Sequence, residues 1–204
     1  MVDLIPSGES VMKILQDTGA YRRGHFVYPN GKHASHYFQM PLAFRFYDNA
    51  RILSVGLSRM FRMEKAIAGR LPKVSIISPS PGGIMVAFGV REALSAEQIY
   101  WAEMEDGRRQ FRQYMADNEV HPAIIVDDIL RSGKAIRETF DLCREIGTPV
   151  IGCGAIAKFE DAPNEIDGVP VKSLLSFDVN FYENEEEWRV SRSASEASEE
   201  RVRY

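Results

Sequence analysis

Two adjacent carboxylates, Asp127 and Asp128, follow a short apolar run at positions 123–126. A run of this length that is rich in β-branched residues is typical of a buried strand. Successive side chains along a strand point to opposite sides. One carboxylate could therefore accept hydrogen bonds from the hydroxyls of a ribose, while the other faces a bound Mg²⁺ or the protein itself.

The acids lead into a short loop with one glycine and then into a predicted helix over residues 136–146. Its apolar residues recur at helical spacing, and Gly147 suits the end of that helix. The free backbone N–H groups at a helix N-terminus suit a phosphate. Strand, acids, loop and helix together predict a sugar phosphate that lies across the end of a sheet.

Two other interpretations compete with this one. Acids at strand ends often only cap the following helix in α/β folds. The residues Ser132-Gly133-Lys134 also look like the end of a nucleotide-binding P-loop, but that motif needs a glycine where this chain has Asp128. The P-loop interpretation is therefore rejected.

At these residues the chain resembles a known family. Residues 126–135 resemble the phosphoribosyl-pyrophosphate (PRPP) motif of the type I phosphoribosyltransferases, and residues 135–138 narrow the resemblance to the orotate branch. Residues 24–38 are similar to the N-terminal segment of that branch, and residues 78–87 to its pyrophosphate-binding loop. The three segments occur in the order of the family and cover roughly residues 10 to 178.

The resemblance implies a reaction in which a nitrogenous base attacks C1 of PRPP and pyrophosphate leaves, with Mg²⁺ held mainly by the ligand rather than by the protein. Asp127 and Asp128 would contact the ribose hydroxyls as the catalytic pair. The 5′-phosphate would be bound by Arg131, Ser132, Gly133, Lys134 and Ala135. The pyrophosphate would be approached by the main chain of Pro81, Gly82 and Gly83. The base would be bound by Tyr37, Phe38 and Lys158, although the two aromatic residues could equally be core residues of a small sheet.

The flexible loop of the family departs from its usual pattern. The cations that reach the pyrophosphate are replaced here by Trp101, Ala102 and Glu105. An acid beside a leaving pyrophosphate would oppose its negative charge. The nearby arginines Arg108, Arg109 and Arg112 could substitute if the loop shifts in register, and the competing interpretation is a solvated charged loop.

Three further departures concern the base, the phosphate loop and the N-terminal segment. Phe159 stands where the family carries the arginine that pairs with the carboxylate of orotate, with Lys158 beside it. Arg131 and Lys134 stand where hydroxyl residues are usual, and Pro29 where a lysine is usual. Because phenylalanine cannot pair with a carboxylate, we expect orotate turnover far below that of a housekeeping enzyme even though PRPP binds.

The bulk properties indicate one domain over residues 1–182, with a small hood at about 1–47, followed by a charged tail at 183–204. A net charge of −4 argues against a nucleic-acid binder. No apolar run is long enough for a membrane span, and the start of the chain is unlike a signal peptide. Cys143 and Cys153 are predicted to be buried free thiols of a cytoplasmic protein, and the histidines near residue 33 to lie on the surface.

Strand and helix patterns alternate along the chain. Helices are predicted at 10–19, 49–63 and 83–94, in addition to the one that follows the acids. Strands are predicted at 74–78, 98–101, 123–126, 150–157 and 171–175, with short antiparallel strands within 24–47 and a polar loop at 104–118. This order predicts an α/β fold: a parallel sheet flanked by helices, with ligands beyond the carboxyl ends of the strands.

The leading functional hypothesis is a transferase that moves phosphoribose from PRPP to a pyrimidine-like base. The alternative is a non-catalytic sensor or regulator on the same fold that binds PRPP or a nucleotide. The missing loop cations favour the sensor, and the aromatic pair favours the enzyme. The resemblance, together with an aromatic-rich N-terminal half, also predicts a homodimer.

Overall fold

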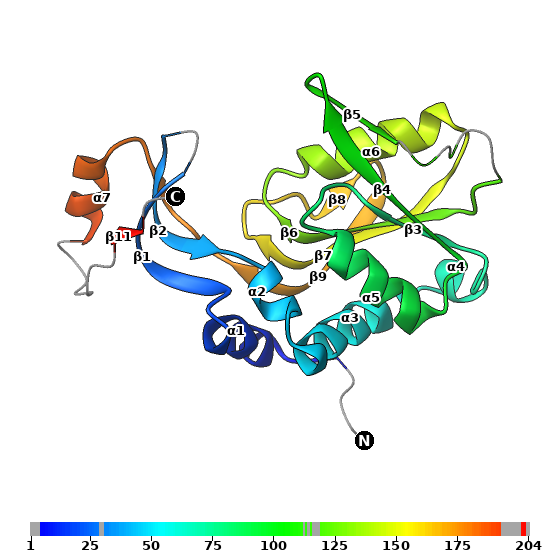
Figure 1. Cartoon of the computed structure of the whole chain (residues 1–204), viewed down its shortest axis with the longest axis horizontal. Helices are drawn as coiled ribbons and strands as arrows, with labels where there is room; N and C mark the ends of the chain where they lie inside the picture. Colours follow the sequence, from blue (N-terminus) through cyan, green and yellow to red (C-terminus); the bar gives the residue numbers. More distant parts are fainter. Residues whose placement is uncertain are drawn as a thin grey trace.

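The computed structural model describes residues 5–28, 31–111, 113, 115, 119–192 and 201–202. They form two sheets (Figure 1). The large sheet has seven strands in the order β5-β4-β3-β6-β7-β9-β8, and the small sheet has four in the order β10-β2-β1-β11. The α/β fold predicted from the alternation, with a small N-terminal sheet beside it, is confirmed.

The large sheet contains β3 (Ser75–Ser78), β4 (Gln98–Glu105), β5 (Arg108–Phe111), β6 (Ala123–Leu130), β7 (Val150–Phe159), β8 (Glu165–Ile166) and β9 (Val169–Phe177). The small sheet contains β1 (Tyr21–Val27), β2 (His33–Phe38), β10 (Phe181–Tyr182) and β11 (Arg201–Val202). The helices are α1 (Gly8–Asp17), α2 (Pro41–Phe44), α3 (Tyr47–Arg62), α4 (Lys65–Ala68), α5 (Ile84–Leu94), α6 (Lys134–Glu145) and α7 (Glu185–Arg192).

The centre of the large sheet is parallel, since β3 pairs in parallel with β4 and β6, β6 with β7, and β7 with β9. Helices α3 and α5 cover one face, and α6 lies on the other (Figure 1). Residues 123–126 at the start of β6 are fully buried, as expected for a strand with both faces covered. Antiparallel β5 and β8 close the two edges.

The predicted polar loop at 104–118 is wrong at its start. Strand β4 continues to Glu105 and turns through Asp106 and Gly107 into β5, to form an antiparallel hairpin. Both turn residues have positive φ, 49° and 77°, which is the conformation that an Asp-Gly pair supplies in two-residue hairpins. Residues 112, 114 and 116–118 of that loop lie outside the described part.

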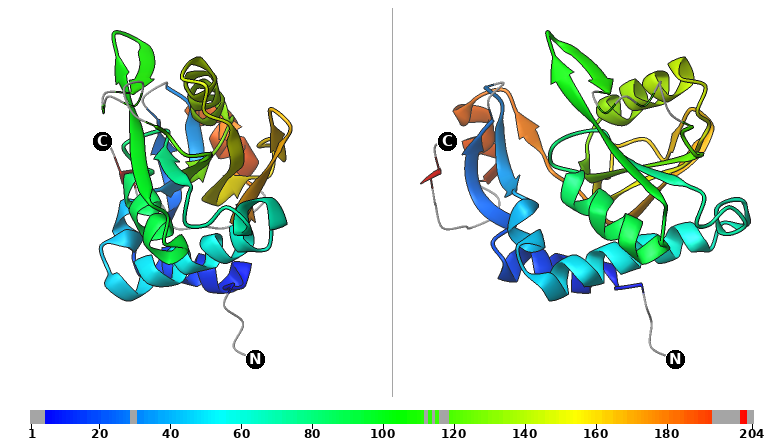
Figure 2. Two further views of the ribbon diagram at one scale, coloured as in Figure 1. Left: turned by 90° about the vertical axis from the view of Figure 1, so that its right-hand side faces the viewer. Right: turned by 45° about the vertical axis from the view of Figure 1, so that its right-hand side comes forward.

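The small sheet takes strands from both ends of the chain. Strands β1 and β2 come from the predicted hood, while β10 and β11 come from the C-terminal part and flank them. The sheet stands beside the large one, with α1 to α3 along the base of both (Figure 2). The predicted hood therefore exists, but it is not made from the N-terminal segment alone.

The charged segment predicted from residue 183 contains a helix, α7, that packs on the small sheet. Its indole Trp188 is 2% exposed and stacks on His25, with ring centroids 3.9 Å apart and an interplanar angle of 15°. His25 is buried in turn, and its Nε2 lies 2.6 Å from Nδ1 of His33. The prediction of surface histidines is thus wrong for His25.

The prediction of buried free thiols is confirmed. Cys143 and Cys153 are free and buried, and burial raises the pKa of each thiol to about 12. Within the described ranges, every helix is too short or too polar to cross a membrane.

Candidate active site

The two predicted acids lie near the end of β6, which extends to Leu130 rather than ending at Val126. The pairing of β6 with β3 stops at Ile125, so the last residues of β6 project past β3 toward the loop at 79–83. The side chain of Asp127 is buried, and its Oδ1 accepts hydrogen bonds from the Ser80 hydroxyl at 2.8 Å and from the backbone N–H of Asp128 at 3.0 Å.

Both carboxylates contact the same glycine turn. A Cβ on Gly83 would lie 2.6 Å from Oδ1 of Asp127, and one on Gly82 would lie 2.8 Å from Oδ2 of Asp128. The prediction that the acids separate to opposite sides is therefore wrong for their carboxylate groups, because the turn wraps over the end of the strand. Only glycine leaves room for the acids at these two positions.

Burial controls the protonation of this pair. Burial first, and then the nearby Asp128, raise the pKa of Asp127, and with the opposing effect of the Ser80 hydroxyl the pKa is about 7. Burial also raises the pKa of Asp128, against the hydrogen bond that it accepts from the backbone of Ile129. Two acids this poorly solvated favour a ligand that donates hydrogen bonds, and vicinal ribose hydroxyls do so.

Hydrogen bonds within the loop hold the glycine turn in place, and helix α5 follows it. The Ser78 hydroxyl donates to the backbone oxygen of Ser80 at 2.6 Å, and the Gly83 N–H donates to that same oxygen at 3.2 Å. Helix α5 begins directly afterwards at Ile84. Pro81 is exposed beside the two glycines, so all three residues predicted to approach a pyrophosphate lie together next to the acids.

The predicted phosphate loop leads into α6 as expected. Gly133 occupies the N-cap position with φ 74°, and a Cβ there would lie 2.9 Å from Pro163. Ser132 and Lys134 on either side are exposed, and Ala135 is half-buried in the first turn of the helix. The exposed end of a 12-residue helix presents backbone N–H groups for a phosphate.

Arg131 does not turn toward that helix end. Its guanidinium carbon lies 3.8 Å from the ring centroid of Phe181, in the small sheet. Lys134 stays on α6, with Nζ 3.7 Å from Oε1 of Glu138. Lys134 therefore stays at the start of α6, whereas Arg131 extends to the small sheet.

The structure describes two arginines of the β4–β5 hairpin, Arg108 and Arg109. Of these two, only Arg109 contacts the segments next to Asp127 and Asp128. Its Nε lies 3.0 Å from Oε2 of Glu138 on α6, and its Nη1 donates to the backbone oxygen of Pro79. The side chain is 10% exposed, so the solvated-loop interpretation is wrong for this residue. Arg108 is exposed and pairs in register with Glu105. Arg112 lies outside the described residues.

The aromatic residues predicted for the base lie on two sides of β2. Phe38 packs on Phe177, with ring centroids 4.2 Å apart, and near Phe159 at 6.2 Å. Tyr37 packs instead on Phe26, at 5.5 Å. Phe38 is therefore the one of the pair that meets the large sheet. Lys158 donates to Oδ1 of Asn164, away from this ring cluster.

Four residues of the site were not found from the sequence. They are Ser80, Glu138, Phe177 and Phe181, which contact Asp127, Arg109, Phe159 and Arg131 respectively. Each contact joins segments that are distant in the sequence. Among them only Glu138 carried a local signal, because it lies one helical turn after Lys134.

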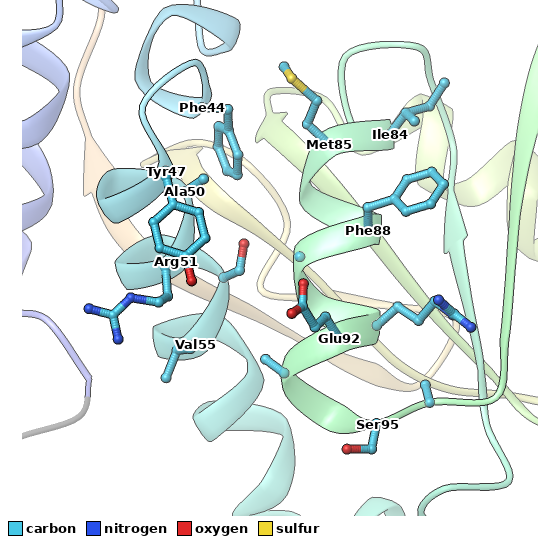
Figure 3. A pocket seen from close by; sticks show the side chains of 15 residues that line it. Phe44, Tyr47, Ala50, Arg51, Val55, Ile84, Met85, Phe88, Glu92 and Ser95 are labelled. Atoms are coloured by element: carbon cyan, nitrogen blue, oxygen red, sulfur yellow. The ribbon is translucent and has the colours of Figure 1, made fainter.

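A separate hollow of about 840 Å³ lies between α3 and α5 (Figure 3). It is bordered by Tyr47, Arg51, Phe88 and Glu92, and none of the residues proposed for the site lines it.

No family model matches the chain. It is 29% identical over 177 residues to an orotate phosphoribosyltransferase of Thermotoga petrophila, covering 86% of this chain and 89% of the relative. An orotate phosphoribosyltransferase of Caldanaerobacter subterraneus is 28% identical over 178 residues, covering 87% of this chain and 89% of the relative. Over most of its length the chain is thus similar to type I phosphoribosyltransferases.

Solved structures of phosphoribosyltransferases share the fold of this chain. The crystal structure of orotate phosphoribosyltransferase from Aeropyrum pernix matches with a TM-score of 0.66 and 20% identity, covering 82% of this chain and 93% of that one. Adenine phosphoribosyltransferase from Thermoanaerobacter pseudethanolicus matches with a TM-score of 0.54 and 16% identity, covering 70% and 88%. At these identities the structures establish the architecture, and the base is a separate question.

Proposed function

We propose that this protein transfers phosphoribose from PRPP to a pyrimidine-like base. The observation that carries the proposal is the pair of the buried Asp127 and the half-buried Asp128, which is packed on the Gly82–Gly83 turn beside the open N-terminus of α6. A ring nitrogen of the base would bond to C1 of PRPP as the bond from C1 to the pyrophosphate oxygen breaks. The electron pair of that bond leaves with the pyrophosphate, and the base nitrogen releases its proton.

The residues would position the reactants rather than react with them. The acids would accept hydrogen bonds from the ribose hydroxyls, and the α6 N-terminus with Ser132 and Lys134 would bind the 5′-phosphate. The glycine turn would admit the pyrophosphate close to the backbone. Arg109 would place positive charge beside the leaving group, where it stabilises the transition state.

A magnesium ion fits this site as part of the ligand. Among the described residues no group of three or more His, Cys, Asp or Glu side chains could hold a metal ion by itself. Mg²⁺ commonly binds through one or two carboxylates together with substrate phosphates. Asp127 and Asp128 supply such carboxylates, and the ion would neutralise charge on the pyrophosphate.

Two measurements test the proposal. PRPP with Mg²⁺ should raise the melting temperature, because a ligand that binds only the folded state stabilises it by mass action. Pyrophosphate should then be released when a panel of pyrimidine bases is added. An unchanged melting temperature at millimolar PRPP would contradict the proposal.

One observation favours the second candidate, a non-catalytic PRPP or nucleotide sensor. Among the hairpin arginines that the structure describes, the one near the site is Arg109, which is already paired with Glu138, and Glu105 lies on the same hairpin. Binding of PRPP without pyrophosphate release for any base would identify the sensor.

A further inference from the structure

Glu138, near the start of α6, lies between two cations. Its Oε2 lies 3.0 Å from Nε of Arg109 on β5, and its Oε1 lies 3.7 Å from Nζ of Lys134 on its own helix. The two pairs differ in burial, because the side chain of Arg109 is 10% exposed and that of Lys134 is 80% exposed. An exposed ion pair contributes little, whereas a buried guanidinium depends on its partner. The contact with Arg109 is therefore the one that fixes the position of a charge.

Arg109 joins three segments around the glycine turn. Its own strand, β5, packs beside α6 (Figure 1). While its Nε faces Glu138, its Nη1 donates a hydrogen bond to the backbone oxygen of Pro79, directly after β3. Among the described residues, the N–H groups of Nη2 have no hydrogen-bond partner, so they remain available to an anion.

The hairpin separates its charges onto two faces. Cross-strand partners share a face, and successive residues of a strand alternate between faces. Arg109 pairs with Met104 on one face. Glu105 pairs with Arg108 on the other face, and it accepts a hydrogen bond there from the Gln110 side chain. The acid of the hairpin is therefore turned away from α6, and the cation is turned toward it.

We propose that Glu138 is a positioning residue, which holds Arg109 against the loop that would admit the pyrophosphate. The inference rests on the proposed function, and it adds a residue that acts on the leaving group through another side chain. Without the carboxylate, a guanidinium with so little access to water would lose its charged partner and turn toward solvent. The positive charge beside the leaving pyrophosphate would be lost with it.

The competing role for Glu138 is inhibition, in which its negative charge keeps Arg109 and Lys134 from a phosphate. The geometry argues against this role, because the carboxylate contacts Nε of Arg109 and leaves Nη2 available. Two cations and one anion also sum to a positive charge, which still attracts a phosphate. The two roles predict opposite signs: removal of the carboxylate weakens pyrophosphate binding if Glu138 positions Arg109, and strengthens it if Glu138 inhibits.

The test compares Glu138→Gln with the matched control Glu145→Gln, which removes the same charge at an exposed position at the other end of α6. Mg²⁺-pyrophosphate and ribose 5-phosphate are the probes for isothermal titration, since they separate the two phosphate ends of the site. Glu138→Gln should weaken pyrophosphate binding about tenfold or more, because a buried cation loses its partner. Its ribose 5-phosphate binding should stay within about twofold of wild type, because the contact with Lys134 is exposed. Glu145→Gln should bind both probes as the wild type does.

A double-variant cycle separates positioning from a merely structural role. If Glu138 acts through Arg109, then Glu138→Gln should change pyrophosphate affinity by less than about twofold once Arg109→Gln is in place. Glu138→Asp should bind pyrophosphate with an affinity between those of wild type and Glu138→Gln, since it keeps the charge with a shorter reach. The proposal is overturned if Glu138→Gln weakens binding equally in both backgrounds, or if this variant alone binds pyrophosphate as tightly as wild type or more tightly.

Failure of the proposed function gives a different result. Pyrophosphate that binds to the wild type, with no transfer of phosphoribose to any base, would overturn the function alone. The cycle would still decide the role of Glu138, because it measures binding rather than transfer. A wild type that binds neither probe would overturn both.

Discussion

Ionisation of the buried Asp127 carboxyl lowers the folding stability of the protein over a predictable pH range. Its pKa is about 7 in the folded protein, against an ordinary value of 3.8, so the folded chain binds more protons than the unfolded chain between these limits. Stability contributed by this group is therefore lost as the pH rises from about 4 to about 7 and stays constant above that range. The raised pKa of Asp128 acts in the same direction.

We expect Asp127→Asn to become more stable relative to wild type as the pH rises from 5 to 8. The variant cannot ionise, so it does not have to bury a charge. Urea unfolding of both proteins at the two pH values measures the difference, and titrating groups that do not interact with Asp127 cancel between them. A difference that does not change with pH would show that the carboxyl titrates normally.

The same residues predict loss of ligand binding. Asp127→Asn with Asp128→Asn should abolish the rise in melting temperature that PRPP causes, because the amides cannot replace two charged acceptors for the ribose hydroxyls. Circular dichroism of the double variant checks that the fold is retained. A folded double variant with wild-type affinity for PRPP would refute the assignment of the site.

Among single residues, the sequence identified Asp127, Asp128, Gly82 and Gly83, since each lies within a local motif. Ser80 and Phe181 could not be found in the same way. Their partners, Asp127 and Arg131, are 47 and 50 positions away, and no spacing rule joins residues across two strands and a loop.

At the scale of elements, the β4–β5 hairpin brings Arg109 to the site. Arg109→Gln should weaken binding of Mg²⁺-pyrophosphate by about 30-fold, as expected when one partner of a buried charge interaction is removed. Arg108→Gln is the matched control, because Arg108 neighbours it on the same strand and is exposed. Isothermal titration with pyrophosphate measures both, and equal affinities in the two variants would place the hairpin outside the site.

Helix α7 depends on one side chain. Trp188→Ala should destabilise the hood by about 3–5 kcal/mol, the usual cost of removing a large buried aromatic residue. Val190→Ala on the same helix should be nearly neutral, since Val190 is 68% exposed. Hydrogen exchange of β1 and β2 is the measurement, and faster exchange in the tryptophan variant alone is the expected result.

The elements themselves were largely predictable from periodicity. The strands at 74–78, 98–101 and 150–157 and the helix at 83–94 appear within a few residues of their expected limits. The hairpin and α7 were missed because both are polar. The hairpin depends on the Asp106–Gly107 turn and α7 on the contact of Trp188 with His25, so apolar periodicity is absent from both.

At the scale of the whole molecule, the face formed by α3 and α5 remains uncovered. Tyr47 is 78% exposed and Phe88 is 49% exposed on the rim of the hollow between them. Arg51 and Glu92 place opposite charges on the same face, which allows a two-fold interface to complement itself. We therefore expect a homodimer through this face.

Phe88→Glu should produce monomers at micromolar concentration in sedimentation velocity, because it buries a charge in the apolar centre of the interface. Met63→Glu is the control, as Met63 is 75% exposed and does not border the hollow. A wild-type chain that sediments as a monomer would contradict the expected dimer.

The contact between the glycine turn and the acids also limits which substitutions can accumulate during evolution. A side chain at Gly83 would collide with Asp127 and with the Ser78 hydroxyl, so Gly83 cannot change while both of these side chains are in place. A lineage released from binding phosphoribose would gain stability by losing the buried acid, since most proteins trade some stability for function. A chain that still carries both acids and both glycines has kept a costly arrangement, which is what selection for the ligand would maintain.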